Sequence, residues 1–449
     1  MPKVTVLLTS FNHGKFIGET IDSIINQTFK DFELIIWDDA STDNSWKIIQ
    51  SYRDKRIKSF KNEINLRPNY GIIKTISEIA QGQYIAIHHS DDVWDVTKLE
   101  KQVLFLEEKE NYGAVFTNVE LINENSLPHE NKGHTYSTIF NQENRSRHEW
   151  LNYFFYHGNA LCHPSVMIRR ECYAECGMYR YGFAQLGDFD MWIRLCIKYE
   201  IFVMPEKLTQ FRLLENEANS SADKPDTRKR SASELFYIYK QYLKIDSLDD
   251  ILKIFPTLQK IQKTKEYSIN FLVATVLLEH TQATANLLGL SILHESLNDI
   301  AEAKIIEKCY SFNYISFVKL SARYDIFNSE NLRNINDEYK KILESTQEYN
   351  YTLLQKFHTF ASNIDKSKNY IMYGYGSIGK ILFPYIKHNI IAIIDLAIKQ
   401  DAIDGIPVVS LSNLRDYKNA NVIVTPMNDE SKILENLKPF NINIVKVEF

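Results

Sequence analysis

Apolar and polar positions alternate along the first 225 residues in a pattern that predicts strands separated by helices. Four apolar, β-branched runs are expected to be strands: KVTVLLTS (3–10), FELIIWDDAS (32–41), RIKSFKN (56–62) and QYIAIHHSDD (83–92). Three segments between them carry apolar residues at helical spacing: KFIGETIDSIINQT (15–28), NSWKIIQSYRD (44–54) and YGIIKTISEIAQG (70–82). This alternation predicts an α/β fold, with a mainly parallel sheet and helices on both faces.

The pattern changes twice further along the chain. Residues 226–365 carry apolar residues at helical spacing with few glycines, which predicts a helical linker or interaction domain. From residue 366, NYIMYGYGSIGKILFPYI (369–386) reads as strand, glycine turn and helix, and short apolar runs follow it. We expect a small Rossmann-like α/β domain there. The predicted domains are therefore 1–225, 226–365 and 366–449.

Composition narrows the class of protein. The chain has 449 residues, 44% hydrophobic and 24% charged, with a net charge of −5, which does not favour nucleic acid as a partner. The first apolar run is too short for a signal peptide, and nothing is long enough to span a membrane. Five cysteines without regular spacing indicate a reducing compartment, so we expect a cytoplasmic protein. Peripheral membrane association and homo-oligomer formation remain open.

Polar residues gather where the predicted strands end. Thr9 closes the first strand, Asp39 the second, and Asp91 and Asp92 the fourth. Ligands of open parallel sheets bind beyond the carboxyl ends of the strands. A carboxylate pair there can hold Mg²⁺ or Mn²⁺ together with phosphate oxygens. A solvated turn is the simpler interpretation of two adjacent aspartates.

The order of these motifs resembles a known family. TVLLTSFNHGKFIGETIDSIINQTFKDFELIIWDDASTDNS (5–45), followed by GQYIAI (82–87) and SDD (90–92), is similar to the opening of the family 2 glycosyltransferases, whose fold is called GT-A. The resemblance covers roughly the first 220 residues. It implies an enzyme that transfers a sugar, usually with inversion, from a nucleoside-diphosphate donor to an acceptor hydroxyl. We expect a UDP-sugar donor, a glycan or glycoconjugate acceptor and a role in surface polysaccharide biosynthesis.

The resemblance also assigns roles to the residues at the strand ends. Thr9 matches a nucleoside contact, Asp39 the aspartate that recognises the uracil edge, and Asp91 a donor contact. Asp92 matches the ligand of a divalent cation, Mn²⁺ or Mg²⁺. Arg67 lies where the family often faces the diphosphate, although a surface arginine fits equally well. For Asp39, an Asx turn or helix cap before residue 41 is the alternative.

A later motif supplies the expected base. QLGDFDMWIRL (185–195) resembles a helix start of the family, and Asp188 matches its general base, which takes the proton of the attacking hydroxyl. A helix N-cap is the alternative role for Asp188. Asp190 is expected to fix the helix, with Trp192 packing and Arg194 pairing around it. His163 either approaches the metal or donor or is a structural histidine.

The chain departs from the family at two positions that bear on the metal. His89 stands where many members have an aspartate, and Leu214 stands where the family often has a histidine. We therefore expect a modest metal affinity, and metal independence remains open. Cys172 and Cys176 lie one helical turn apart near His163, but no second pair completes a zinc site.

The glycine loop near the end of the chain allows two interpretations. GYGSIG supplies Gly374, Gly376 and Gly379 between a strand and a helix, and Asp395 follows the next strand, as in a dinucleotide-binding fingerprint. Ile381 replaces the Ser or Thr of a P-loop. The segment GIPVVSLSNL (405–414) resembles small units attached to bacterial sugar acyltransferases and sugar methyltransferases. A nucleotide site and a fold used only for packing or dimerisation are both consistent with it.

Two other functions compete with glycosyl transfer. The glycine fingerprint favours an NAD(P)-dependent enzyme of sugar nucleotides. The departures at His89 and Leu214 favour a non-catalytic scaffold that binds a nucleotide sugar.

Overall fold

The computed structural model describes residues 1–131, 133–214, 224–261, 265–374, 376–395, 398–417, 420–425, 430–440 and 442–446. The chain forms two compact units, Met1–Phe327 and Asn328–Phe449. Each has its own sheet and its own apolar clusters. The division at 225 and 365 expected from the sequence stays a prediction, because a compact unit does not define where an independently folding domain ends.

The first unit is built around an eight-stranded sheet with the order β3-β2-β1-β4-β7-β6-β8-β5. Its strands are β1 (Val4–Ser10), β2 (Phe32–Asp38), β3 (Ile57–Lys61), β4 (Tyr84–His89), β5 (Val93–Trp94), β6 (Tyr112–Ile122), β7 (Met167–Arg169) and β8 (Glu200–Arg212). The pairs β3–β2, β2–β1, β1–β4 and β6–β8 are parallel, whereas β7 and β5 are antiparallel to their neighbours. The predicted mainly parallel α/β sheet is confirmed.

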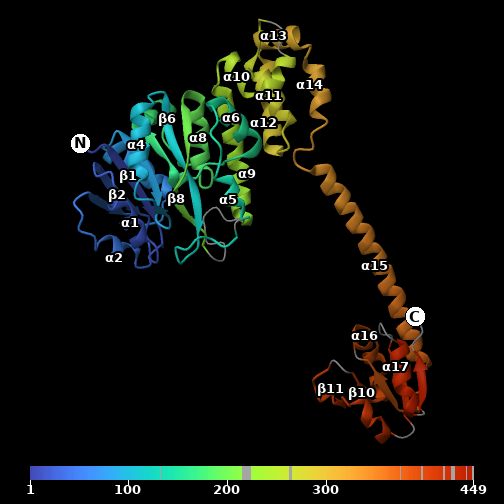
Figure 1. Ribbon diagram of the computed structural model, residues 1–449. Coiled ribbons are helices and arrows are strands. Elements are labelled where there is room, and N and C mark those ends of the chain that lie inside the picture. The colour runs from blue at the N-terminus through green and yellow to red at the C-terminus, as the bar shows by residue number, and fades with distance from the viewer. Residues whose placement is uncertain are drawn as a thin grey trace. The chain divides into compact units, whose positions relative to one another are not determined.

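Helices cover both faces of this sheet (Figure 1). Side chains alternate along β1, so that Leu7 faces one apolar cluster and Val6 the other. The Val6 face is covered by α1 (Ile17–Ile25), α2 (Ser45–Ile49) and α4 (Lys98–Glu108). The Leu7 face is covered by α3 (Pro68–Lys74), η1 (Thr75–Ile79), α6 (Arg147–His157), α7 (Arg170–Cys176) and α8 (Gly187–Lys198). Two short helices, α5 (Thr135–Ile139) and η2 (His163–Ser165), lie in the connections.

The helices that follow residue 224 extend the core on the Leu7 face. They are α9 (Pro225–Tyr239), η4 (Lys240–Lys244), α10 (Leu248–Ile254), η5 (Pro256–Lys260), α11 (Ile269–Glu279), α12 (Ala283–Asn298), α13 (Ile300–Tyr310) and α14 (Tyr314–Ser321). Tyr242, Leu272 and Leu277 belong to the same buried cluster as Leu7 and Ile87 of the sheet. Helices α9 to α14 therefore belong to the first unit.

The second unit is a smaller α/β body. It consists of α15 (Ser329–Asn363), β9 (Tyr370–Tyr373), α16 (Ser377–Ile386), η6 (Lys387–Asn389), β10 (Ile390–Ile394), β11 (Ala402–Ile403), β12 (Ile406–Pro407), η7 (Leu411–Asp416), β13 (Asn421–Val424), α17 (Glu430–Leu437), η8 (Lys438–Phe440) and β14 (Asn443–Lys446). Its parallel sheet has the order β10-β9-β13-β14, with a separate antiparallel pair β11–β12. One apolar cluster lies on each face of this sheet.

The structure can be compared with the sequence-based expectations about membrane-spanning segments and about cysteines. Among the residues that the structure describes, no helix is both long enough and apolar enough to cross a membrane. All five cysteines are free thiols.

Candidate functional site

The register of the parallel strands brings the predicted polar residues to one edge of the sheet. Thr9 of β1 lies opposite His89 of β4, and Ser10 lies opposite Asp38 of β2. Asp39 follows directly after β2, and Asp91 lies two residues after the end of β4. The carboxyl ends of these strands therefore meet at the edge of the sheet where the sequence predicts a ligand site.

Asp39 is fixed by the loop that follows β3. Its Oδ1 accepts hydrogen bonds from Asn62 Nδ2 and from the Leu66 backbone N–H, both at 2.7 Å. The neighbouring Asp38 Oδ1 accepts the Ser41 N–H, three residues on, at 2.9 Å. Asp39 is thus held at the sheet edge by the loop that follows β3.

Asp92 is a deeply buried carboxylate at this edge. Only 1% of the residue is exposed, and its Oδ1 accepts the Arg212 backbone N–H at 2.8 Å. Within the described part of the chain, its Oδ2 is buried without a hydrogen-bond partner. Potential ligand atoms of His89, Asp91 and Asp92 lie within 4.8 Å of one another. Burial, with the adjacent Asp91 charge, raises the pKa of Asp92 well above its ordinary value.

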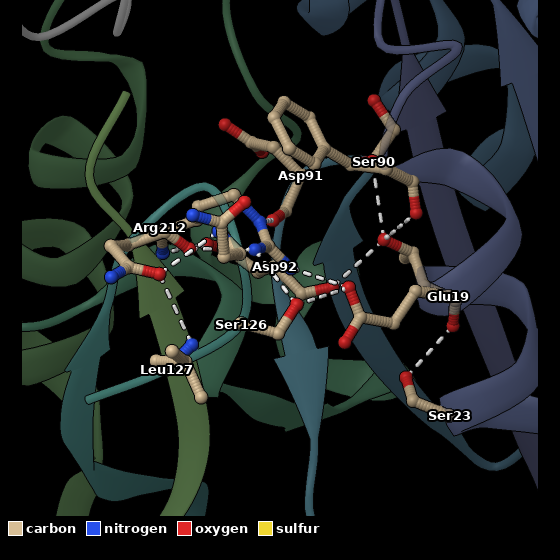
Figure 2. A network of polar contacts seen from close by, with 12 residues as sticks. Glu19, Ser23, Ser90, Asp91, Asp92, Ser126, Leu127 and Arg212 are labelled. Carbon is tan, nitrogen blue, oxygen red and sulfur yellow. Dashed lines mark hydrogen bonds and ion pairs between the residues drawn. The ribbon is translucent and has the colours of Figure 1, made fainter. Parts of the chain in front are cut away.

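The side chain of Arg212 fastens the backbone around this pair (Figure 2). The residue is completely buried, and its Nε donates to the Asp91 carbonyl at 2.7 Å. Its Nη2 lies 2.7 Å from Glu19 Oε2, and its Nη1 donates to the Asn123 carbonyl and to Ser126 Oγ. This end of β8 thereby joins α1 and the end of β6 to the two aspartates.

His89 is held by a second histidine. Its Nε2 lies 3.2 Å from His163 Nδ1, and His163 Nε2 lies 2.9 Å from the Tyr179 hydroxyl. His163 therefore helps to fix the orientation of the His89 ring. On the other side of the pair, His13 Nδ1 lies 2.8 Å from Ser90 Oγ and 3.8 Å from Asp91 Oδ1.

Asp188 lies in the first turn of α8 and is not its N-cap. The N-cap is Leu186, whose side chain makes no capping bond, so the alternative role expected for Asp188 was wrong. Asp188 Oδ2 accepts from Asn159 Nδ2 at 2.9 Å, and its Oδ1 accepts the Phe189 N–H. Burial raises the pKa of Asp188 to about 6, although these hydrogen bonds act against the rise.

The start of α8 is stabilised by a carboxylate from the helical section. Glu234 of α9, only 6% exposed, accepts the backbone N–H groups of Ala184, Gln185 and Leu186 at 2.7–3.2 Å. A negative charge at a helix N-terminus satisfies amides that have no partner within the helix and complements its dipole. Glu234 thus holds the segment that carries Asp188.

Other residues of α8 are structural, as the sequence indicated. Asp190 is completely buried and pairs with Arg194 at 2.9 Å and with Arg180 at 3.3 Å. Trp192 is buried and meets Phe116 edge to face.

The remaining predicted donor contacts are Thr9 and Arg67. Thr9 is 9% exposed at the end of β1. Arg67 is exposed, with a positive φ of 69°, immediately before the proline that begins α3. Its role toward a diphosphate stays a prediction.

The glycine loop of the second unit has a structural explanation for two of its glycines. Gly374 has a φ of 94°, and a Cβ on Gly379 would lie 2.4 Å from the Gly374 carbonyl oxygen. The loop and α16 therefore require both residues for backbone packing. Gly376 precedes α16 in open surroundings, and Asp395 follows β10. Nucleotide binding at this loop stays a prediction.

The residues that were not predicted from the sequence are those that position the predicted site residues through hydrogen bonds. His13 lies in the turn that the motif pattern marked, so its position next to the first strand was a usable signal. Asn159, Glu234 and the contacts of Arg212 carried no local signal, because each acts on a residue far away in the sequence.

The chain is similar to known glycosyltransferases in both the family and the relatives that it matches. Residues 5–170 match the family described as glycosyl transferase family 2. The chain is 33% identical over 218 residues to the uncharacterized glycosyltransferase MJ1057 of Methanocaldococcus jannaschii, covering 47% of this chain and 71% of that protein. It is 30% identical over 244 residues to the putative teichuronic acid biosynthesis glycosyltransferase TuaG of Bacillus subtilis, covering 54% and 88%.

A third relative has a more specific name. The chain is 38% identical over 107 residues, 24% of this chain and 42% of the relative, to the Escherichia coli protein UDP-Glc:alpha-D-GlcNAc-diphosphoundecaprenol beta-1,3-glucosyltransferase WfaP.

Proposed function

The chain belongs to glycosyltransferase family 2, and we propose that it transfers a sugar, with inversion, from a UDP-linked donor to an acceptor hydroxyl in surface polysaccharide or glycoconjugate synthesis. The relative named as a UDP-glucose-dependent transferase supports the donor, and the relative named for teichuronic acid biosynthesis supports the pathway class. The observation that carries the proposal is the cluster of His89, Asp91 and Asp92 beside the strand ends.

The residues of this cluster fit a divalent cation. A buried carboxylate oxygen without a hydrogen-bond partner requires an explanation, and Asp92 Oδ2 is such an atom among the described residues. Asp91 offers a second carboxylate and His89 a ring nitrogen within 4.8 Å. Mn²⁺ and Mg²⁺ both bind carboxylate oxygens and keep places for water and phosphate oxygens. When bound, the cation would neutralise charge on the departing diphosphate.

Asp39 is the proposed donor-recognition residue. Its Oδ1 is fixed by Asn62 and Leu66, so the carboxylate is oriented before any ligand arrives. A carboxylate accepts hydrogen bonds only, which suits the N–H of a uracil edge. Thr9, Arg67 and Asp91 are proposed as further contacts to the nucleoside and diphosphate.

Asp188 is the proposed general base. The acceptor oxygen forms a bond to the anomeric carbon as that carbon's bond to the diphosphate oxygen breaks, and the hydroxyl proton passes to the Asp188 carboxylate. A carboxylate buried enough to have a pKa of about 6 is a stronger base than an exposed aspartate and is still ionised at neutral pH. Asn159 fixes its Oδ2, and Glu234 fixes the turn before it.

The proposal is tested with a panel of nucleotide sugars. The purified full chain is incubated with each donor in Mn²⁺, in Mg²⁺ or in a chelator, and release of the nucleoside diphosphate is measured. We expect release from at least one UDP-sugar, increased by a cation. If no donor of any nucleotide class is bound or cleaved under these conditions, the proposed function is wrong.

A further inference from the structure

Within the described residues of the second unit, the first two thirds of helix α15 have no apolar partner. α15 is 35 residues long and forms the N-terminal part of the second unit (Figure 1). The apolar clusters found in the described chain include residues of α15 only from Leu353 onward. A helix segment that buries no face is only marginally stable in water, because most helical stability comes from packing. The segment 329–352 therefore needs something to cover it.

An apolar stripe runs along this uncovered segment. Leu332, Ile335, Tyr339 and Ile342 are 53%, 39%, 67% and 54% exposed, and we call these four residues the seam. At about 100° of rotation per residue, the seam lies on the same side of the helix as Phe357 and Ala361. Those two residues are buried in the core of the second unit. The face that packs within the unit thus continues beyond it as an exposed strip.

The spacing of the seam fits a second helix. Its residues are separated by three, four and three positions, which is the alternation of the a and d positions of a heptad. Thr346 and Leu353 occupy the next a positions. A heptad seam pairs with another seam of the same period, because knobs on one helix then meet holes on the other along the whole length.

The residues beside the seam permit pairing with an identical helix. The flanking e and g positions from 331 to 345 are Asn331, Asn336, Glu338, Leu343 and Ser345. Only one of them is charged, so two copies can approach without a row of like charges between them. In a parallel pair, Glu338 would face Leu343 of the second copy. The other charged residues of this segment, such as Arg333 and Lys341, occupy outer positions.

We propose that α15 is a dimerisation helix, in which the seam pairs with the seam of a second copy of this chain in a short two-stranded coiled coil. The inference does not depend on the proposed glycosyl transfer, since it uses no residue of that site. A second copy of α15 has the same heptad period as the seam, and its flanking positions carry few charges. A dimer would also place two catalytic units in one assembly.

The test compares two charge-matched variants of the full chain. Ile335→Glu with Ile342→Glu places two acids in the seam. Asn334→Glu with Gln355→Glu places two acids on the outer side of the same helix and is the control. Molar mass is measured by light scattering and by sedimentation over a range of protein concentrations. Hydrogen exchange reports protection of the amides between residues 332 and 346.

We expect the wild type and the control to reach twice the monomer mass, and the seam variant to stay at the monomer mass with faster exchange in α15. Donor cleavage per chain should be the same in all three proteins, which shows that the seam variant is folded. A monomeric wild type at every concentration would overturn the proposal, and protection of α15 in that monomer would assign the seam to another part of the same chain. A seam variant that remains dimeric would also overturn it.

Discussion

Asn159 Nδ2 lies 2.9 Å from Asp188 Oδ2, and this hydrogen bond ties the proposed base to the segment that supports the proposed metal cluster. Four residues after Asn159, His163 contacts His89 at 3.2 Å. One short connection between α6 and β7 therefore orients a residue on each side of the site. The base and the cluster are positioned together although they lie almost 100 residues apart in the sequence, at 89–92 and 188.

Replacing Asp188 by asparagine removes the base with little change in shape. We expect Asp188→Asn to lower the transfer rate by about 10²- to 10⁴-fold, the usual contribution of a positioned general base. UDP binding should be unchanged, because the proposed donor contacts lie elsewhere. The measurement is steady-state transfer alongside calorimetry, with Asp31→Asn on an exposed position as the control. A loss smaller than about tenfold would remove Asp188 from the mechanism.

The transfer rate should fall at low pH, and the pH at the midpoint of this acid limb should reflect the pKa of Asp188. This pKa is raised to about 6 by burial, so the carboxyl is protonated and inactive below about pH 6 and the rate rises as pH passes through that value. Asn159 stabilises the charged form, and Asn159→Ala should move the limb to higher pH. An acid limb at the same pH in both proteins would contradict the assignment.

The same pKa shift has a consequence for stability. A carboxyl with a higher pKa in the folded chain holds its proton more tightly there than in the unfolded chain. The folded state therefore loses stability as pH rises from the ordinary aspartate value of 3.8 to about 6. Asp188→Asn should remove this loss and raise the melting temperature at neutral pH while it lowers the transfer rate.

His89 should influence which cation the site prefers. Its ring nitrogen belongs to the cluster with Asp91 and Asp92, and Mg²⁺ prefers oxygen ligands more strongly than transition-metal ions do. We expect the wild type to favour Mn²⁺ over Mg²⁺, and His89→Asp to reduce that preference. Thermal shifts with UDP and each cation measure it, with His157→Asp, an exposed histidine, as the control. An identical preference in both variants and the wild type would exclude His89 as a ligand.

Glu234 should couple the helical section to catalysis. Its two carboxylate oxygens accept three backbone amides before α8. Glu234→Gln leaves one acceptor oxygen, and we expect a loss of about 1–3 kcal/mol in the free energy of unfolding together with a lower turnover number. Asp226→Asn, on the exposed part of the same helix, is the matched control. Denaturant titration and steady-state kinetics measure both effects, and a Glu234→Gln protein with unchanged turnover would limit Glu234 to a role in stability.

The sequence could predict the parts of the site that follow strands. The apolar runs before Thr9, Asp39 and Asp91 define strands, and the parallel arrangement brings their ends together. Long-range contacts were not predictable in the same way. Glu234 lies in an ordinary amphipathic helix, and nothing near it in the sequence indicates that it accepts amides about 50 residues earlier.

The same distinction explains the helical section. Its helical periodicity was visible, because apolar residues repeat along each helix. The surface that these residues cover could not be predicted, because periodicity shows which face of a helix is buried but not which element it packs against. Tyr242 and Leu272 pack in the cluster that contains Leu7 of the sheet, a contact between residues more than 200 positions apart.

Titration calorimetry of UDP shows whether Asp39 forms a nucleotide site and Asp92 a cation site. With Mn²⁺, the wild type should bind UDP, Asp39→Ala should bind it weakly, and Asp92→Asn should lose the increase in affinity that Mn²⁺ produces. The Asp92 amide oxygen would still accept the Arg212 N–H, so the fold should be kept. UDP binding that neither substitution changes, or no binding with any cation, would show that Asp39 and Asp92 do not form this site.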